Sequence, residues 1–110
     1  SAAGLIGIPG ASGYNSAKHG VIGLSKTIAL EYASQNIRVN AVCPGFIETP
    51  MLERVTDASI KIREQLIKMV PMKRVAKPSE IADAVAWLLS ERSSYVTGVA
   101  LPVDGGWIAQ

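Results

Sequence analysis

The two segments of this chain that most resemble β-strands lie far apart, and their separation limits how they can pair. Arg38–Val42 and Val99–Val103 are short, carry β-branched valines and are each bounded by turn-forming residues. Helical patterns occupy much of the sequence between them. Strands joined through a helix pair in parallel, because a hairpin needs a tight turn. We therefore expect an α/β fold, with these strands at the edge of a doubly wound parallel sheet.

The segment from Tyr14 to about Ser34 has the pattern of a helix that is apolar on two sides. One apolar set consists of Ala17, Val21, Leu24, Ile28 and Tyr32, and the second of Ile22, Ala29, Leu30 and Ala33. A helix with two apolar faces has to be covered on both. We expect the sheet to cover one face and a neighbouring helix or a second subunit to cover the other.

A long insertion follows the first strand. It runs from residue 46 to residue 77, with helical patterns near Met51–Val55 and Ser59–Val70. Irregular connections of this length are usually functional. Pro78 then suits the first turn of another helix, where its missing N–H is no loss, and that helix is expected to end near Ser90. The chain thus divides into 1–45 (loop, helix and strand), 46–77 (insertion) and 78–110 (last helix and strand) within one partial domain.

The composition excludes several classes of protein. The 110 residues are enough for one domain, and 48% of them are hydrophobic, which is ample for a core. The single cysteine, Cys43, cannot form an internal disulfide, and we expect it to be a small buried hydrophobe. A net charge of +2 argues against nucleic acid as a partner, and the sequence has no apolar run near the ~20 residues that span a membrane. We expect a cytoplasmic protein with no metal site, since no His, Cys and carboxylate spacing suggests one.

Tyr14 and Lys18 are spaced for proton transfer. Residues four apart lie on the same face of a helix, so the Lys18 ammonium would stand close to the Tyr14 phenol. A tyrosine ordinarily titrates near pH ~10, and a nearby positive charge, together with the positive end of the helix dipole, favours tyrosinate. Tyr14 is therefore a candidate acid and base. His19 follows Lys18 directly and is expected to point off this face.

These residues and several others resemble the short-chain dehydrogenase/reductase family. Ser1, Tyr14 and Lys18 have the family's spacing, with twelve residues and then three between them. The segment Ile37–Gly45 is similar to the family's sixth strand and its Pro-Gly turn. Further motifs follow in family order, at Arg74, Pro78–Ala82, Val96–Gly98 and Asp104–Gly106.

The resemblance implies the C-terminal part of a Rossmann-type fold and a reaction. Hydride would pass between NAD or NADP and a small-molecule carbonyl or secondary alcohol. Tyr14 would move the proton, Lys18 would bind the nicotinamide ribose, and Ser1 would hold the substrate oxygen. The implied cofactor-binding residues are Tyr14, Lys18, Pro44, Gly45, Ile47 and Thr49. The insertion would be a substrate lid, and the protein a homo-oligomer, either a dimer or a tetramer.

Other family features are missing from the sequence. It has neither a Gly-x-Gly-x-x-Gly turn for the cofactor pyrophosphate nor an Asn-Asn-Ala-Gly stretch. We therefore expect a fragment without the cofactor-binding half, inactive alone. Two alternatives stay open, namely a non-enzymatic oligomerisation module and a related epimerase or dehydratase. The three-residue gap between Tyr14 and Lys18 favours carbon–oxygen chemistry, because the family's enoyl reductases have a gap of six.

Positive charge is concentrated in the insertion. The segment 61–77 contains one acidic residue, Glu64, and six basic residues, which gives a local net charge of +5. The basic residues are Lys61, Arg63, Lys68, Lys73, Arg74 and Lys77. One interpretation is a solvated face of the lid. The other is a landing surface for an acidic substrate, such as a phosphopantetheine thioester.

Overall fold

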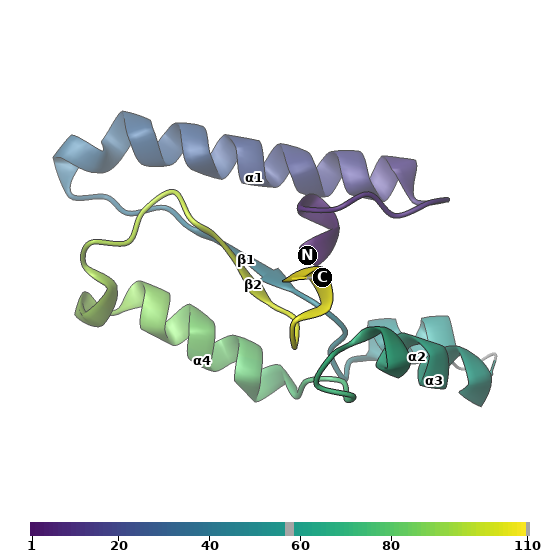
Figure 1. Cartoon of the computed structure of the whole chain (residues 1–110). Helices are drawn as coiled ribbons and strands as arrows, with labels where there is room; N and C mark the ends of the chain where they lie inside the picture. The colour runs from purple at the N-terminus through teal and green to yellow at the C-terminus, as the bar shows by residue number, and fades with distance from the viewer. Residues whose placement is uncertain (57–58, 110) are drawn as a thin grey trace.

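The computed structural model describes residues 1–56 and 59–109, which form three layers. Two short strands lie between two long helices (Figure 1). Strand β1 (Ala41–Pro44) pairs in parallel with β2 (Ala100–Val103), with Cys43 opposite Pro102. Helix α1 (Ser12–Tyr32) packs on one face of this pair and α4 (Pro78–Leu89) on the other. The parallel pair and its helical crossover confirm the expected α/β class.

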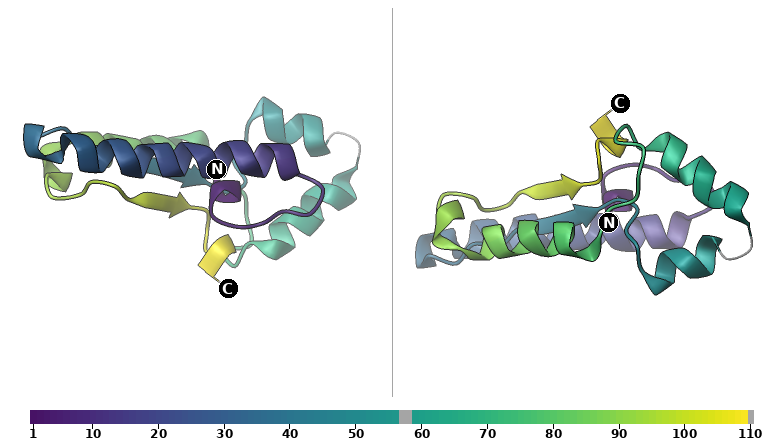
Figure 2. Two further views of the ribbon diagram at one scale, coloured as in Figure 1. Left: turned by 90° about the horizontal axis from the view of Figure 1, so that it is seen from above. Right: turned by 90° about the horizontal axis from the view of Figure 1, so that it is seen from below.

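Shorter elements complete the described part of the chain. They are η1 (Ala2–Gly4), η2 (Ala33–Gln35), α2 (Pro50–Thr56), α3 (Ile60–Met69), η3 (Glu91–Ser93) and η4 (Trp107–Ala109). Helices α2 and α3 project beyond the end of the sheet, in the insertion (Figure 2). Within the described residues, no helix combines the length and apolar character that crossing a membrane would need.

The first strand begins three residues later than predicted. Residues 38–40 were expected in the strand, but their hydrogen bonds go to the loop before β2. The Asn40 side chain donates from Nδ2 to the Val96 carbonyl at 2.9 Å and accepts at Oδ1 from the Val99 N–H at 3.0 Å. The Arg38 guanidinium donates to the same Val96 carbonyl at 3.1 Å. Side chains thus make most of the contacts here, beside one backbone hydrogen bond from the Gly98 N–H to the Val39 carbonyl at 2.7 Å, and regular pairing starts only at Ala41.

Helix α1 buries a narrower face than its sequence suggested. Ile22 and Ala29 are buried against the layer below, as members of the second predicted apolar set. Leu30 belongs to the same set but is 83% exposed. From the first set, Val21 and Leu24 are also exposed, the latter by 60%. The outer side of α1 therefore remains apolar and uncovered within the described chain.

We use the word lid from here on as a name for the insertion, residues 46–77. Both of its ends meet at a narrow base, which we call the lid neck (Phe46–Glu48 with Ala76). The Ala76 N–H donates to the Phe46 carbonyl at 3.0 Å, and the Glu48 N–H donates to the Ala76 carbonyl at 2.9 Å. Ile47 and Ala76 form a parallel bridge. The neck lies directly after β1, so the lid leaves the molecule at the carboxyl end of the sheet, where α/β folds bind their ligands.

Candidate active site

The structure brings all of the predicted site residues to one cavity. Its volume is about 650 Å³, and its lining includes Ser1, Tyr14, Lys18, Pro44, Gly45, Ile47 and Thr49. These residues come from the chain start, the first turns of α1, the end of β1 and the segment leading to α2. A second hollow of about 410 Å³, lined by residues such as Arg74 and Asp104, contains none of them.

Tyr14 and Lys18 lie side by side on α1. Tyr14 is in the first turn and is 47% exposed, and the Lys18 Nζ lies 5.2 Å from the centroid of its ring. The predicted i, i+4 arrangement therefore holds in space.

Ser1 stands at the same cavity because η1 is packed tightly against α1. Its Oγ accepts a hydrogen bond from the Ala3 N–H at 3.1 Å, which uses a lone pair and leaves the hydroxyl proton for another acceptor. Gly4 makes the close approach possible. A Cβ at this position would lie 2.6 Å from Ile22 Cδ1 and 2.7 Å from the Lys18 carbonyl oxygen.

Asn15 is a positioning residue that the sequence analysis missed. Its side chain is buried and donates from Nδ2 to the carbonyls of Ala3, at 3.0 Å, and Ile6, at 2.6 Å. It therefore ties the segment that carries Ser1 to the helix that carries Tyr14. The Asn15 Oδ1 is buried without a hydrogen-bond partner among the described residues. The signal in the sequence was an asparagine inside a helical first turn, where this residue type is rarely favoured without a tertiary role.

The lid and the chain end supply an apolar wall that was also missed. Met51, Val55 and Leu66 line the cavity together with Phe46 and Trp107. The Phe46 and Trp107 rings pack with centroids 4.5 Å apart. The structure puts Trp107 at the cavity, whereas Tyr95 is fully exposed.

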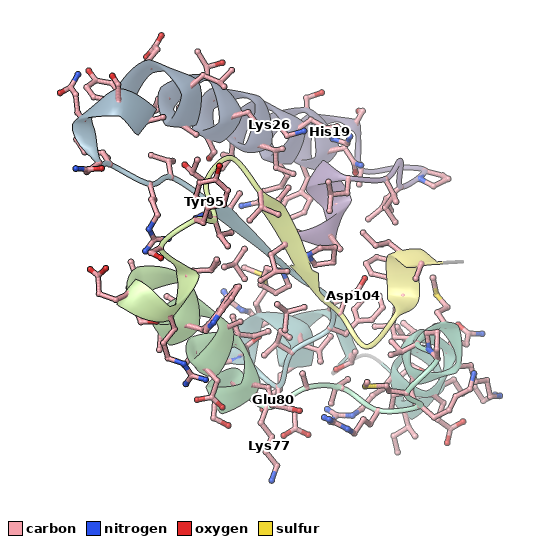
Figure 3. The ribbon with its side chains drawn as sticks, turned by 60° about the vertical axis from the view of Figure 1, so that its left-hand side comes forward. His19, Lys26, Lys77, Glu80, Tyr95 and Asp104 are labelled. Atoms are coloured by element: carbon pink, nitrogen blue, oxygen red, sulfur yellow. The ribbon has the colours of Figure 1, made fainter. Side chains whose placement is uncertain are left out.

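Two arginines of the basic segment 61–77 form ion pairs with acids outside that segment. Arg63 contacts Glu48 at 3.2 Å, and Arg74 holds Glu80 through two bonds of 2.6 and 2.7 Å. Glu80 also accepts from the Lys77 N–H at 2.8 Å, and the two residues lie together at the start of α4 (Figure 3). The Arg74 hydrogen bonds, and then that of Lys77, lower the pKa of Glu80 to about 2.

His19 and Cys43 stay outside the candidate chemistry. The His19 Nδ1 lies 2.9 Å from the Asn15 carbonyl oxygen, and His19 is not part of the cavity lining. Cys43 is buried in β1, and burial raises the pKa of its thiol, which disfavours the reactive thiolate. Within residues 1–56 and 59–109, no group of three His, Cys, Asp or Glu side chains is placed to hold a metal ion.

Known proteins share this fold and much of this sequence. A family model described as enoyl-(acyl carrier protein) reductase matches residues 1–108. The 3-oxoacyl-(acyl-carrier-protein) reductase of Thermotoga maritima is 48% identical over 108 residues, covering 98% of this chain and 43% of that protein. Cyclohexanol dehydrogenase of an Acinetobacter species is 46% identical over 110 residues, covering all of this chain and 41% of that protein. The chain thus spans about two fifths of the length of these curated relatives.

Solved structures agree with the sequence relatives. Levodione reductase superposes with a TM-score of 0.94 at 45% identity, over 99% of this chain and 44% of that one. A 4-hydroxyisoleucine dehydrogenase complexed with NADH gives 0.92 at 32% identity, over 100% and 45%. A variant of actinorhodin polyketide ketoreductase with NADPH gives 0.92 at 38%, over 97% and 44%. These likenesses define a Rossmann-type oxidoreductase fold. The chain belongs to the short-chain dehydrogenase/reductase family.

Proposed function

We propose that this chain forms the catalytic and substrate-binding part of an oxidoreductase that uses NAD or NADP. The reaction is hydride transfer between the cofactor and a carbonyl or secondary alcohol. The observation that carries this proposal is the meeting of Ser1, Tyr14 and Lys18 at one cavity beside the carboxyl end of β1. Family membership supports it, because the relatives named above are reductases and dehydrogenases.

The donor set of the cavity fits the nicotinamide end of the cofactor. Lys18 offers an ammonium for ribose hydroxyls, and Pro44 and Ile47 add apolar surface. The Thr49 hydroxyl also lines the cavity and donates to the Ile47 carbonyl at 3.3 Å. When bound, the reduced cofactor supplies the hydride. Two of the solved relatives hold NADH or NADPH, in agreement with either nucleotide here.

The proton is moved by the chain's own residues. In carbonyl reduction, the Tyr14 hydroxyl gives its proton to the substrate oxygen as the carbonyl carbon gains hydride. Ser1 donates a hydrogen bond to the same oxygen and fixes its position, a contribution of orientation. Lys18 stabilises the tyrosinate that remains. In alcohol oxidation the same steps run in reverse.

Carbon–oxygen chemistry is preferred over reduction of a carbon–carbon double bond. The matching family model is described as an enoyl reductase, but the gap between Tyr14 and Lys18 is three residues, not the six of the family's enoyl reductases. The proposal therefore expects turnover of ketones and no turnover of the corresponding enoyl compounds.

Tyr14→Phe tests the proposal in the protein expressed from its complete reading frame. We expect kcat to fall by about 10²–10⁴-fold, the usual contribution of a positioned acid or base. The dissociation constant for NADH or NADPH should change little, because a proton and not a contact surface is lost. Tyr95→Phe is the matched control, since Tyr95 is fully exposed and away from the cavity.

Three results would contradict the proposal. Retention of more than about a tenth of the activity in Tyr14→Phe would remove the assigned acid–base role. Absence of any nucleotide-dependent turnover would favour an assembly module. Products that form without net consumption of nucleotide would favour an epimerase or a dehydratase.

A further inference from the structure

We propose that the substrate of this site has an uncharged, apolar body, held by the lid, and that it is not a phosphate-bearing acyl thioester. This inference rests on the proposed function, because it takes the reacting carbonyl to lie between Ser1 and Tyr14. The inference concerns the chemical character of the non-reacting part of the substrate.

The part of the cavity supplied by the lid is hydrocarbon. Helix α2 contributes Met51, Leu52 and Val55, and α3 contributes Leu66. Met51 is 63% exposed and Val55 is 59% exposed, so both offer free apolar surface at the opening. Trp107 adds an aromatic surface from the chain end. Contact with such surfaces favours apolar ligand groups in proportion to the area buried.

Charge is scarce in the same lining. Of the described residues that form it, only Lys18 and Arg54 have a basic or acidic side chain. Lys18 lies over the Tyr14 ring. Arg54 is exposed and donates from Nε to the Pro50 carbonyl at 3.2 Å. A substrate carboxylate or phosphate would therefore lose water against hydrocarbon, with one solvated guanidinium as its remaining partner, and this is unfavourable.

The basic segment 61–77 does not change this balance. Its six cations are absent from the cavity lining. Arg63 and Arg74 are already paired with Glu48 and Glu80, and the Lys73 Nζ donates to the Lys68 carbonyl at 2.8 Å. These contacts make the segment a solvated, partly neutralised face. Among the described residues, the basic segment therefore places no positively charged side chain in the cavity lining that could bind a polyanion.

Matched ketones test the inference in the protein expressed from its complete reading frame. 2-Octanone and 7-oxooctanoate have the same reacting end and differ by a terminal carboxylate. We expect kcat/KM to be at least about tenfold higher for 2-octanone. From 2-butanone to 2-octanone, kcat/KM should rise about threefold per methylene. Acetoacetyl-coenzyme A should be the poorest substrate of the panel. Equal or faster turnover of either anionic substrate would overturn the inference.

A lid variant locates the effect. Met51→Asp puts a carboxylate into the apolar wall and should lower kcat/KM for 2-octanone by at least about tenfold, with a smaller loss for 2-butanone. Ile60→Asp is the control, because Ile60 is 80% exposed on the same lid but does not line the cavity. Equal losses in both variants would overturn the inference.

Failure here and failure of the proposed function give different results. If Tyr14→Phe abolishes turnover of every ketone, but the wild-type protein turns over the anionic ketones faster than the neutral ones, only the substrate class is wrong. If turnover survives in Tyr14→Phe, the proposed function itself is wrong.

Discussion

At the scale of single residues, Asn15 connects the two predicted parts of the candidate active site. Ser1 and Tyr14 come from different segments, and the distance between their hydroxyls matters for any reaction at a shared oxygen. The two Asn15 hydrogen bonds to the Ala3 and Ile6 carbonyls fix one segment on the other. Gly4 allows the same contact sterically, as its missing Cβ leaves room for Ile22.

Asn15→Ala should therefore destabilise the protein. The buried Ala3 carbonyl and the half-buried Ile6 carbonyl would lose their donor, and the free energy of unfolding should fall by about 2 kcal/mol. Denaturant unfolding measures this loss. Ser16→Ala is the control, because Ser16 is an exposed neighbour on the same helix and the substitution makes a similar change in helix propensity. Equal stability of the two variants would contradict the assigned contact.

The site residues with a local signal could be predicted, and those that depend on tertiary contacts could not. Tyr14 and Lys18 are four apart, so helix geometry alone places them together. Asn15 acts on Ala3 and Ile6 through a loop whose path the local sequence does not set. Met51 and Trp107 looked like ordinary apolar residues, because only the folded lid shows that they border a cavity.

At the scale of elements, one carboxylate at the beginning of α4, that of Glu80, binds both the helix terminus and the end of the lid. Pro78 is the first helical residue, as predicted. Glu80 accepts from the Lys77 N–H, which would otherwise be an unpaired donor at the helix start, and also binds Arg74 at the end of the lid. The same carboxylate therefore stabilises the helix terminus and the lid segment next to it.

The depressed pKa of Glu80 gives a pH prediction with a definite sign. The hydrogen bonds from Arg74, and then that from Lys77, lower its pKa from the ordinary value of 4.5 to about 2 in the folded protein. The unfolded chain therefore binds the proton more readily, so this contribution to stability is present above pH ~4.5 and is lost as the pH falls towards 2. An NMR titration of the Glu80 side chain should show the low midpoint, and Arg74→Met should raise it. A midpoint near the ordinary value of 4.5 in the wild-type protein would contradict the ion pair.

The limits of the helices were predicted more closely than those of the strands. Helix signals such as Pro78 are local. The start of β1 depends on Arg38 and Asn40, whose side chains reach across to Val96 near the other strand. A sequence pattern cannot distinguish a residue in a ladder from one held by side chains, so β1 was placed too early.

At the scale of the whole molecule, the outer side of α1 is a candidate surface for association. Val21 and Leu24 are exposed there, and an exposed apolar surface of this kind is typical of an interaction site. We propose that a second copy of the protein covers it, as expected for a homo-oligomer. The basic segment and the ion-paired lid, in contrast, present charged side chains to solvent.

Sedimentation velocity tests this proposal on the 110-residue chain. We expect a species larger than a monomer, because the outer side of α1 is uncovered in the chain alone. Leu24→Glu should shift the population towards monomer by placing a charge in that surface. Ile60→Glu, at an exposed site on the lid, should have no such effect. A monodisperse wild-type monomer would contradict the proposed role of α1.

The lid neck has a consequence for how such a protein can change its specificity. Phe46 and Ala76 are hydrogen-bonded neighbours, so the lid leaves and rejoins the fold at almost the same point. Residues added or removed between them would not alter the spacing of β1 and β2, and extra loop length costs little free energy. The lid is thus an exchangeable module. A new substrate preference could evolve by replacing it, while Tyr14 and Lys18 keep their places on α1.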